Sequence, residues 1–525
     1  MLRSADLGRP ERPFRLLAGT AFAAAIGLLI VALFWAILSA ARARAGGEVH
    51  LDVGYVLYIT TLQAGLSTAL SLAVGIALAW ALNRLRFPGR EVVVGLFASA
   101  IVTPGLVVAF GLIDVWGRAG WLGGLGVPIF GLGGVVGAHL VLDGAFAARI
   151  LLGRLDAIPE ARLKTGQSLG LNAWRRFGVI DWPAIRGSLP GLAAIIFLLA
   201  FTSFPIVLLL GGGPSVQTLE VAIYSAVRLD FDLNAAVTLA LIQIGLCAVI
   251  IVASSALAPV ATSVARSGQP RWQDAGAARA AQWIVLAFAL FGFGAPLAAV
   301  IADGAVSVPD VLAESSFWSS MCTSLWIALG SSVLSLIVAL AVAAASAAAP
   351  GRALRTLVAV PAYAYLAVPA VALSLGAFLL VRDSGLQPET TAPLVVVLAN
   401  ALLALPFAVA TLGPPFEAIA RSRGRLIRAL SLGGVRQFTL IEWPLVARDA
   451  GLAFALSFCF SLGDLGVIAL FGTQNFATLP LQMVRALGAY RSHEAAAIAA
   501  LMLVLTIGAF VAIPKLFGRL GDAGA

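Results

Sequence analysis

Long apolar segments recur along the chain, and short segments between them carry most of the charge. Twelve are long enough to cross a bilayer as a helix, which takes roughly 20 residues. They lie at 16–40, 55–82, 91–116, 131–153, 188–212, 232–260, 282–303, 319–347, 356–381, 393–413, 449–472 and 491–514. They are too long and too uniformly apolar for barrel strands. The pattern therefore predicts an all-α polytopic membrane protein with about 12 transmembrane helices in the lipid bilayer.

The composition supports this prediction. Of the 525 residues, 61% are hydrophobic and 11% are charged, whereas soluble domains are about a quarter charged. The first apolar segment, 16–40, follows Arg3, Arg9, Arg12 and Arg15 as in a signal peptide, but it exceeds the roughly 7–15 apolar residues of a cleavable one. We interpret it as the first transmembrane helix, which places the N-terminus in the cytoplasm.

Positive charge alternates between the two sides that this topology predicts. The cytoplasmic segments hold 26 lysines and arginines, and the outer segments hold seven. Basic residues favour the cytoplasmic side of membrane proteins. The asymmetry predicts that both termini are cytoplasmic, and it explains the net charge of +9 without a nucleic-acid partner.

One cytoplasmic segment occurs twice. Residues 156–183, DAIPEARLKTGQSLGLNAWRRFGVIDWP, align without gaps with 417–444, EAIARSRGRLIRALSLGGVRQFTLIEWP, at an offset of 261. Ten of the 28 positions are identical, and both copies end in an acid, Trp and Pro. Six predicted spans separate the copies, so both face the same side and the halves are parallel repeats. Two equivalent surfaces predict docking of two copies of one soluble partner.

Each copy is predicted to contain a short helix, a turn and a second short helix. Such a segment can insert an apolar side chain into a partner's groove, and Leu169 with Gly170 and Leu430 with Ser431 are the candidates. The alternative is that these residues only pack on their own half. The arginines are candidates for pairing with acids of a partner, or they only enforce the topology. The candidate coupling residues are Asp156, Ala157, Arg162, Leu169, Gly170, Arg175, Phe177, Trp182 and Pro183, and Glu417, Ala418, Arg423, Leu430, Ser431, Gly433, Arg436, Phe438, Trp443 and Pro444.

The segment SLGLNAWRRFGVIDWP (168–183) resembles the EAA loop of binding-protein-dependent ABC importer permeases. The EAA triplet is replaced by Lys164, Thr165 and Gly166, and the Leu-Pro that ends the family motif is Trp-Pro in both copies. Two further stretches, 201–243 (FTSFPIVLLLGGGPSVQT onward) and 461–505 (SLGDLGVIALFGTQNFAT onward), resemble the single-chain thiamine ABC transporter permeases of Gram-negative bacteria. Fused ferric-iron permeases are similar in architecture.

This resemblance covers nearly the whole chain and implies a type I ABC importer permease fold. It also implies a bacterial inner-membrane complex with two ATPase subunits and a periplasmic thiamine-binding protein. The domains would be an arm with the first helix (1–54), a first permease domain (55–260), a linker with the seventh helix (261–317), a second permease domain (318–514) and a tail (515–525).

The chain has no G-x-x-x-x-G-K-[ST] phosphate loop, so its energy comes from a partner or from an ion gradient. The importer resemblance implies that partner subunits bind ATP, and we expect no catalytic residue and no cofactor in this chain. The three cysteines and three histidines are scattered, and they predict no metal site.

Intramembrane acids are rare and suggest functional sites. Asp464, in SLGDLGV, lies within the eleventh span, and Ser203 is its counterpart in the first half. An acid beside the path would favour passage of cationic thiamine, and the alternative is a structural role at a helix break. Asp143 is a weaker candidate. The loops GGGPSVQT (211–218) and GTQNFAT (472–478) are candidate outer gates or contacts for the binding protein.

Three alternatives remain. The cargo could be ferric iron or a phosphorylated thiamine. The chain could be an ion-coupled secondary transporter, which predicts inverted repeats and paired intramembrane charges, whereas this duplication is parallel. A membrane enzyme would need a grouping of catalytic side chains, and the sequence shows none.

Overall fold

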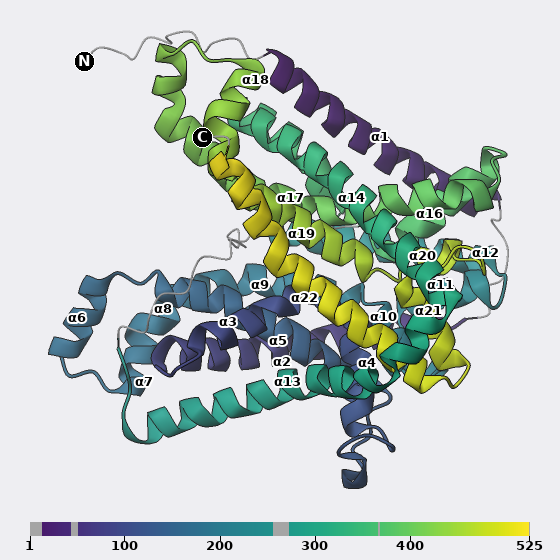
Figure 1. Cartoon of the computed structure of the whole chain (residues 1–525), viewed down its shortest axis with the longest axis horizontal. Helices are drawn as coiled ribbons and strands as arrows, with labels where there is room; N and C mark the ends of the chain where they lie inside the picture. The colour runs from purple at the N-terminus through teal and green to yellow at the C-terminus, as the bar shows by residue number, and fades with distance from the viewer. Residues whose placement is uncertain (1–12, 44–50, 256–271, 366–367, 524–525) are drawn as a thin grey trace. The chain divides into compact units, whose positions relative to one another are not determined.

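The computed structural model describes residues 13–43, 51–255, 272–365 and 368–523 (Figure 1). Every regular element in these ranges is a helix, which confirms the all-α prediction. Ten of the described helices are long and apolar enough to cross a membrane. An eleventh span results if the bent pair Arg90–Ile101 and Gly105–Trp116 is counted as one. The expected number of twelve is not confirmed.

The span expected at 356–381 is two helices, α15 (Arg352–Ala364) and α16 (Ala370–Asp383). Each is too short to cross a bilayer alone. The corresponding span of the first half is also broken, because α3 (Arg90–Ala98) with its 3-10 extension meets α4 (Gly105–Trp116) at 115°. Pro104 and Pro369 directly precede α4 and α16, and proline disfavours helix in the residue before it.

The long helices of the first half include α2 (Val53–Arg84), α5 (Leu132–Asp156) and α12 (Leu233–Ser255). Those of the second half include α14 (Ser315–Ala348), α17 (Pro388–Ala429), α19 (Trp443–Leu462) and α22 (Ser492–Ala523). In the first half α2 packs along α5, and in the second half α17 packs along α19. These pairs form the centres of the two halves.

The chain divides into two compact units that differ from its sequence halves. One contains Met1–Ala43, Met321–Thr478 and Leu505–Ala525, and the other contains Arg44–Ser320 and Leu479–Val504. The helix α1 (Pro13–Ala43) packs on α15 and α16 of the second half. The helix α13 (Gly276–Ala313) packs on α2 and α4 of the first half. The first helix of each half is thus an outer helix of the opposite half.

Glycines permit the close approach of α1 and α13 to helices of the unit in which each lies. A Cβ atom on Gly19 of α1 would lie 2.2 Å from the Cβ of Ala345 on α14. A Cβ atom on Gly111 of α4 would lie 2.4 Å from the carbonyl oxygen of Pro296 on α13. Helices in membranes approach closely where such small residues meet, so these positions fix α1 and α13 against their neighbours.

Candidate functional site

The two copies of the repeated segment, called here the first and second coupling loops (156–183 and 417–444), share one local structure. After a turn at Gly170, the first loop contains α7 (Ala173–Arg176), the π-helical turn η3 (Phe177–Asp181) and α8 (Trp182–Ile185). After a turn at Ser431, the second contains α18 (Gly434–Gln437), the π-helical turn η7 (Phe438–Glu442) and the start of α19. π-Helical turns are rare and occur frequently at functional sites.

The loops differ at their start. In the first loop, α5 ends at Asp156 and a separate helix, α6 (Glu160–Ser168), begins after Pro159. In the second loop, Ala420 occupies the position of Pro159, and α17 continues unbroken to Ala429. Pro159 is the cap residue at which α6 begins, and proline disfavours helix in the residue before it, whereas Ala420 imposes no such restriction.

The leucines proposed for docking are exposed, Leu169 to 71% and Leu430 to 57%. Two more pairs of exposed apolar side chains occupy equivalent positions, and sequence reasoning missed them. These pairs are Trp174 with Val435 and Val179 with Leu440. Their common offset of 261 residues was the signal that could have identified them. The two coupling loops therefore expose apolar side chains at the same three positions of the repeat.

The other candidate residues fall into two groups. Ala157 and Ala418 are exposed, and so are the four arginines of the duplicated motif, Arg162, Arg175, Arg423 and Arg436. The acids that open the loops are half-buried and contact their own chain. Asp156 accepts a hydrogen bond from Asn83 (2.7 Å), and Glu417 pairs with Arg421 (2.7 Å). The arginines, unlike these acids, extend toward solvent where a partner can reach them.

The closing acid-Trp-Pro residues have structural roles. The Trp182 ring packs against Phe177 at a centroid distance of 6.3 Å, and Trp443 against Phe438 at 5.9 Å. Pro183 and Pro444 lie in the first turn of α8 and α19, where a missing N–H group is tolerated. The aromatic pair and the proline thus fix the exit of each loop into the next helix.

The acids of this signature, Asp181 and Glu442, are buried at 0% and 3% exposure. Arg84 at the end of α2 lies 2.5 Å from Asp181, and Arg176 lies 3.5 Å from it. Arg15 at the start of α1 lies 2.6 Å from Glu442. Buried carboxylates require a cation and further hydrogen bonds. Each loop is therefore held by a guanidinium from a helix outside the loop.

Two of the three residues proposed for the substrate path, Ser203 and Asp464, lie at breaks between helices. Ser203 is buried between α9 (Leu189–Phe201) and α10 (Pro205–Leu210). Asp464 is half-buried between α19 and α20 (Ile468–Phe471), and its carboxylate accepts a hydrogen bond from the Val467 amide at 3.1 Å. Irregular backbone at membrane depth is tolerated where protein or a water-filled cavity surrounds it. Both halves therefore break their helix at the same position in the repeat.

Asp143 differs from Asp464 in its surroundings. It is buried on α5, and its carboxylate lies 3.0 Å from Nδ1 of His139, one helical turn earlier. The pairing accounts for a polar side chain inside the helix bundle without any ligand.

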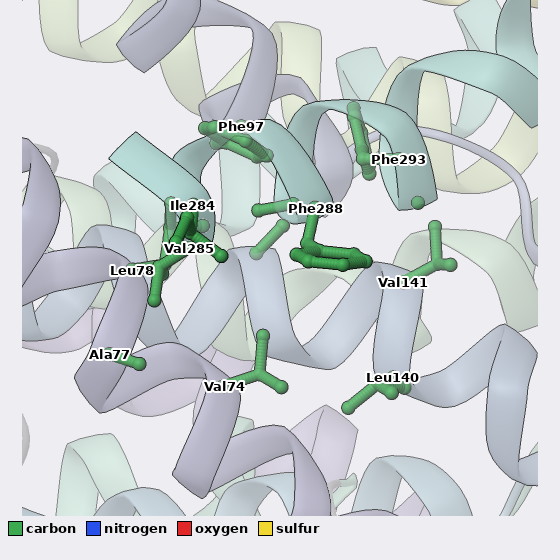
Figure 2. Close-up of a pocket in the computed structure, with 13 residues that line it drawn as sticks. Val74, Ala77, Leu78, Phe97, Leu140, Val141, Ile284, Val285, Phe288 and Phe293 are labelled. Atoms are coloured by element: carbon green, nitrogen blue, oxygen red, sulfur yellow. The ribbon is translucent and has the colours of Figure 1, made fainter. Parts of the chain in front are cut away.

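A cavity of about 330 Å³ lies between α2, α3, α5 and α13 (Figure 2). Hydrocarbon side chains line it, among them Val74, Phe97, Leu140 and Phe288. It offers no charged or hydrogen-bonding side chain to a polar cation, so it is not a candidate for the substrate path. Within the described ranges, no three His, Cys, Asp or Glu side chains are grouped so as to hold a metal ion.

Comparison with known proteins identifies relatives over nearly the full length. The thiamine transport system permease protein ThiP of Salmonella typhimurium is 35% identical, covering 97% of this chain and 98% of its own. ThiP of Escherichia coli is 35% identical over 89% of both chains. A putative 2-aminoethylphosphonate transport system permease protein of Salmonella choleraesuis is 29% identical, with 85% of its length matching 41% of this chain. No family model matches the chain.

Proposed function

The chain belongs to the family of thiamine transport system permease proteins, and on that premise we propose that it imports thiamine as the membrane-spanning subunit of an ABC transporter. Two separate ATPase subunits supply the energy, one on each coupling loop. The observation that carries this proposal is the pair of coupling loops, which share a local fold and expose the same three apolar positions.

The apolar side chains and the arginines have different roles in docking. Leu169 and Leu430 insert into a groove on each ATPase, since burying an apolar side chain is favourable and non-directional. Acids around that groove pair with the exposed arginines Arg162 and Arg175 of the first loop and Arg423 and Arg436 of the second. These pairs set the orientation of each ATPase on its loop. Each coupling loop then moves together with the ATPase that binds it.

Transport follows from movement of the two coupling loops. ATP brings the two ATPases together, and each coupling loop passes the movement to the helices it joins. The two halves then change between states open to the cytoplasm and to the periplasm. A thiamine-loaded periplasmic binding protein favours the outward-open state, and hydrolysis resets the complex, because each ligand stabilises the state that it binds best.

The cargo path follows the helix breaks. Asp464 attracts the thiamine cation, and Ser203 offers a hydroxyl in the other half, whereas Asp143 is occupied by its contact with His139. The chain is a multi-pass membrane protein, and we place it in the bacterial inner membrane with both termini in the cytoplasm. The distribution of basic residues supports that orientation.

The relatives' names favour thiamine over ferric iron as the cargo. The parallel duplication argues against an ion-coupled secondary transporter, whose repeats are frequently inverted. The match of a relative to 41% of this chain also supports two permease halves in one polypeptide.

The decisive experiment is ATP-driven uptake of labelled thiamine into vesicles that hold this chain, its ATPase and its binding protein, with ferric iron as the parallel cargo. We expect thiamine uptake that requires all three components. Uptake of iron instead would change the assigned cargo from thiamine to iron. Gradient-driven uptake by this chain alone would contradict the assignment to an ABC importer.

A further inference from the structure

The first coupling loop is tied to the helix that begins the second half. Arg176, fully buried at the end of α7, donates both Nη groups to the carboxylate of Asp274, at 2.5 and 2.7 Å. Asp274 lies two residues before α13, and Gln282 on α13 donates to the same carboxylate at 2.6 Å. The Arg176 guanidinium also lies 4.7 Å from the Trp272 ring centroid. This buried cluster joins the loop to the start of α13.

The second coupling loop is tied to the helix that begins the first half. Arg15, in the first turn of α1, donates to Glu442 at 2.6 Å and to the Gly434 carbonyl at 3.4 Å. Gln437 donates to the same oxygen of Glu442 at 2.6 Å. Glu442 ends the π-helical turn of the loop. This cluster joins the loop to the start of α1.

The two clusters use the same two positions of the duplicated motif. Gln437 corresponds to Arg176, and Glu442 corresponds to Asp181. The order of charge is reversed, since the first loop presents a cation to the neighbouring helix and the second presents an acid. If both clusters had the same residues, duplication alone would explain them. Here the charges are exchanged between loop and helix, so the connection is present in both halves although different residues form it.

Substitutions on the surrounding helices match this reversal. Arg84, in the last turn of α2, neutralises Asp181 in the first half, whereas the last turn of α14 carries no basic residue. Ala345 is the residue that Gly19 of α1 approaches most closely. The small side chains admit α1 at this position, and Arg15 of α1 then provides the guanidinium that α14 lacks. The second loop therefore depends on α1 for its cation.

We propose that these clusters, called here the loop latches, make α1 and α13 part of the coupling machinery. Each latch positions one docking loop and passes the movement of its ATPase to the helix that leads the opposite sequence half. Arg15 and Arg176 are the positioning residues. The inference rests on the proposed docking of ATPases to the coupling loops.

The chemistry of the latches suits transmission of movement. Buried ion pairs add little net stability over apolar packing of the same shape, but bidentate and charge-assisted hydrogen bonds fix geometry closely. A loop held this way cannot shift along α1 or α13 without separating opposite charges away from water. Loop and helix consequently move as one body.

The test compares Arg15→Gln and Glu442→Gln with the wild type in the complete complex. The measured quantities are ATPase co-purification, thermal stability, and ATP hydrolysed per thiamine imported. We expect co-purification within about twofold of wild type and an ATP-to-thiamine ratio at least fivefold higher, because hydrolysis continues while α1 no longer follows the loop. Arg15→Lys retains the cation and should restore most of the coupling.

Arg382→Gln is the matched control, since Arg382 forms an exposed pair with Asp383 at 2.7 Å away from both loops. An unchanged ATP-to-thiamine ratio in either assembled latch variant would overturn the proposal. If both latch variants fail to assemble while Arg382→Gln assembles, the Arg15–Glu442 pair is required for folding. That result would also overturn the proposal. Failure of the proposed function itself would differ, since the wild-type chain would then neither bind the ATPase nor import thiamine.

Discussion

Arg84 and Asp181 lie 97 residues apart in the sequence and 2.5 Å apart in the structure, and both are buried. The contact ties the end of α2 to the exit of the first coupling loop. It explains why an apolar membrane protein retains an acid before the Trp-Pro of this loop. The acid is the internal anchor of a surface whose apolar side chains face outward.

Replacing Asp181 by Asn leaves the guanidinium of Arg84 buried without its counter-charge. Removing one partner of a buried ion pair costs about 3–5 kcal/mol, so we expect the free energy of unfolding to fall by roughly 3 kcal/mol. Chemical unfolding in detergent micelles measures this change. Asp383→Asn, which removes an exposed partner of Arg382, should cost less than about 1 kcal/mol. Equal effects of the two variants would contradict the anchoring role of Asp181.

Introducing a glutamate at both exposed leucines, Leu169→Glu with Leu430→Glu, should separate the ATPases from the chain. A charge is costly to bury in an apolar groove, so co-purified ATPase should fall at least tenfold. Thermal stability should be unchanged, because both side chains are exposed in the isolated chain. Leu386→Glu alters a leucine of similar exposure (56%) outside the coupling loops. Normal co-purification and transport in the double variant would exclude these leucines from docking.

The single variants Trp174→Glu and Val435→Glu extend this test to the residues found only in the structure. Each places a charge at one of the three apolar positions that the two loops share, so we expect a partial loss of bound ATPase, smaller than that of the double leucine variant. Quantifying the ATPase-to-permease ratio after purification measures the loss. Retention of the full ratio would restrict the docking surface to the leucines.

The turn at the centre of each coupling loop uses left-handed backbone, with φ of +62° at Gly170 and +50° at Ser431. Residues with a Cβ atom lose about 1–2 kcal/mol in this conformation. Gly170→Ala should therefore lower the free energy of unfolding by about 1 kcal/mol, and Ser431→Gly should raise it by up to about 1 kcal/mol. No atom lies within 4 Å of the added Cβ at Gly170 or at Gly187. Gly187→Ala, where φ is not positive, is therefore the control and should not destabilise.

Asp464→Asn removes the charge from the helix break and keeps an oxygen that can accept the hydrogen bond from Val467. If the charge attracts the thiamine cation, initial uptake rates should fall several-fold while complex assembly stays normal. Ser203→Ala provides the comparison at the equivalent position of the first half. An uptake rate equal to wild type for Asp464→Asn would remove Asp464 from the substrate path and leave it only its hydrogen bond with the Val467 amide.

Hydrophobic patterning predicted the all-α class, and the internal repeat predicted where the two coupling loops lie. Hydrophobic patterning could not predict the 115° bend between α3 and α4, because a bent pair of helices and a straight helix can have the same apolar composition. The sequence alone places Arg15 and Arg84 only among the basic residues of the cytoplasmic segments. Their partners lie 427 and 97 residues away, so no local pattern connects them. Hydropathy also carries no information about which outer helix packs on which half.

The exchange of α1 and α13 has a consequence for biosynthesis. A ribosome delivers α1 to the membrane long before α15 and α16, on which α1 packs, have been made. The first half in turn lacks α13 until translation has passed residue 313, and it lacks the stretch Leu479–Val504 of its compact unit until late in translation. Neither half can complete its packing while it is the only one synthesised. Because both halves belong to one polypeptide, the helices that complete the packing of each half are made in the same chain and remain close to it.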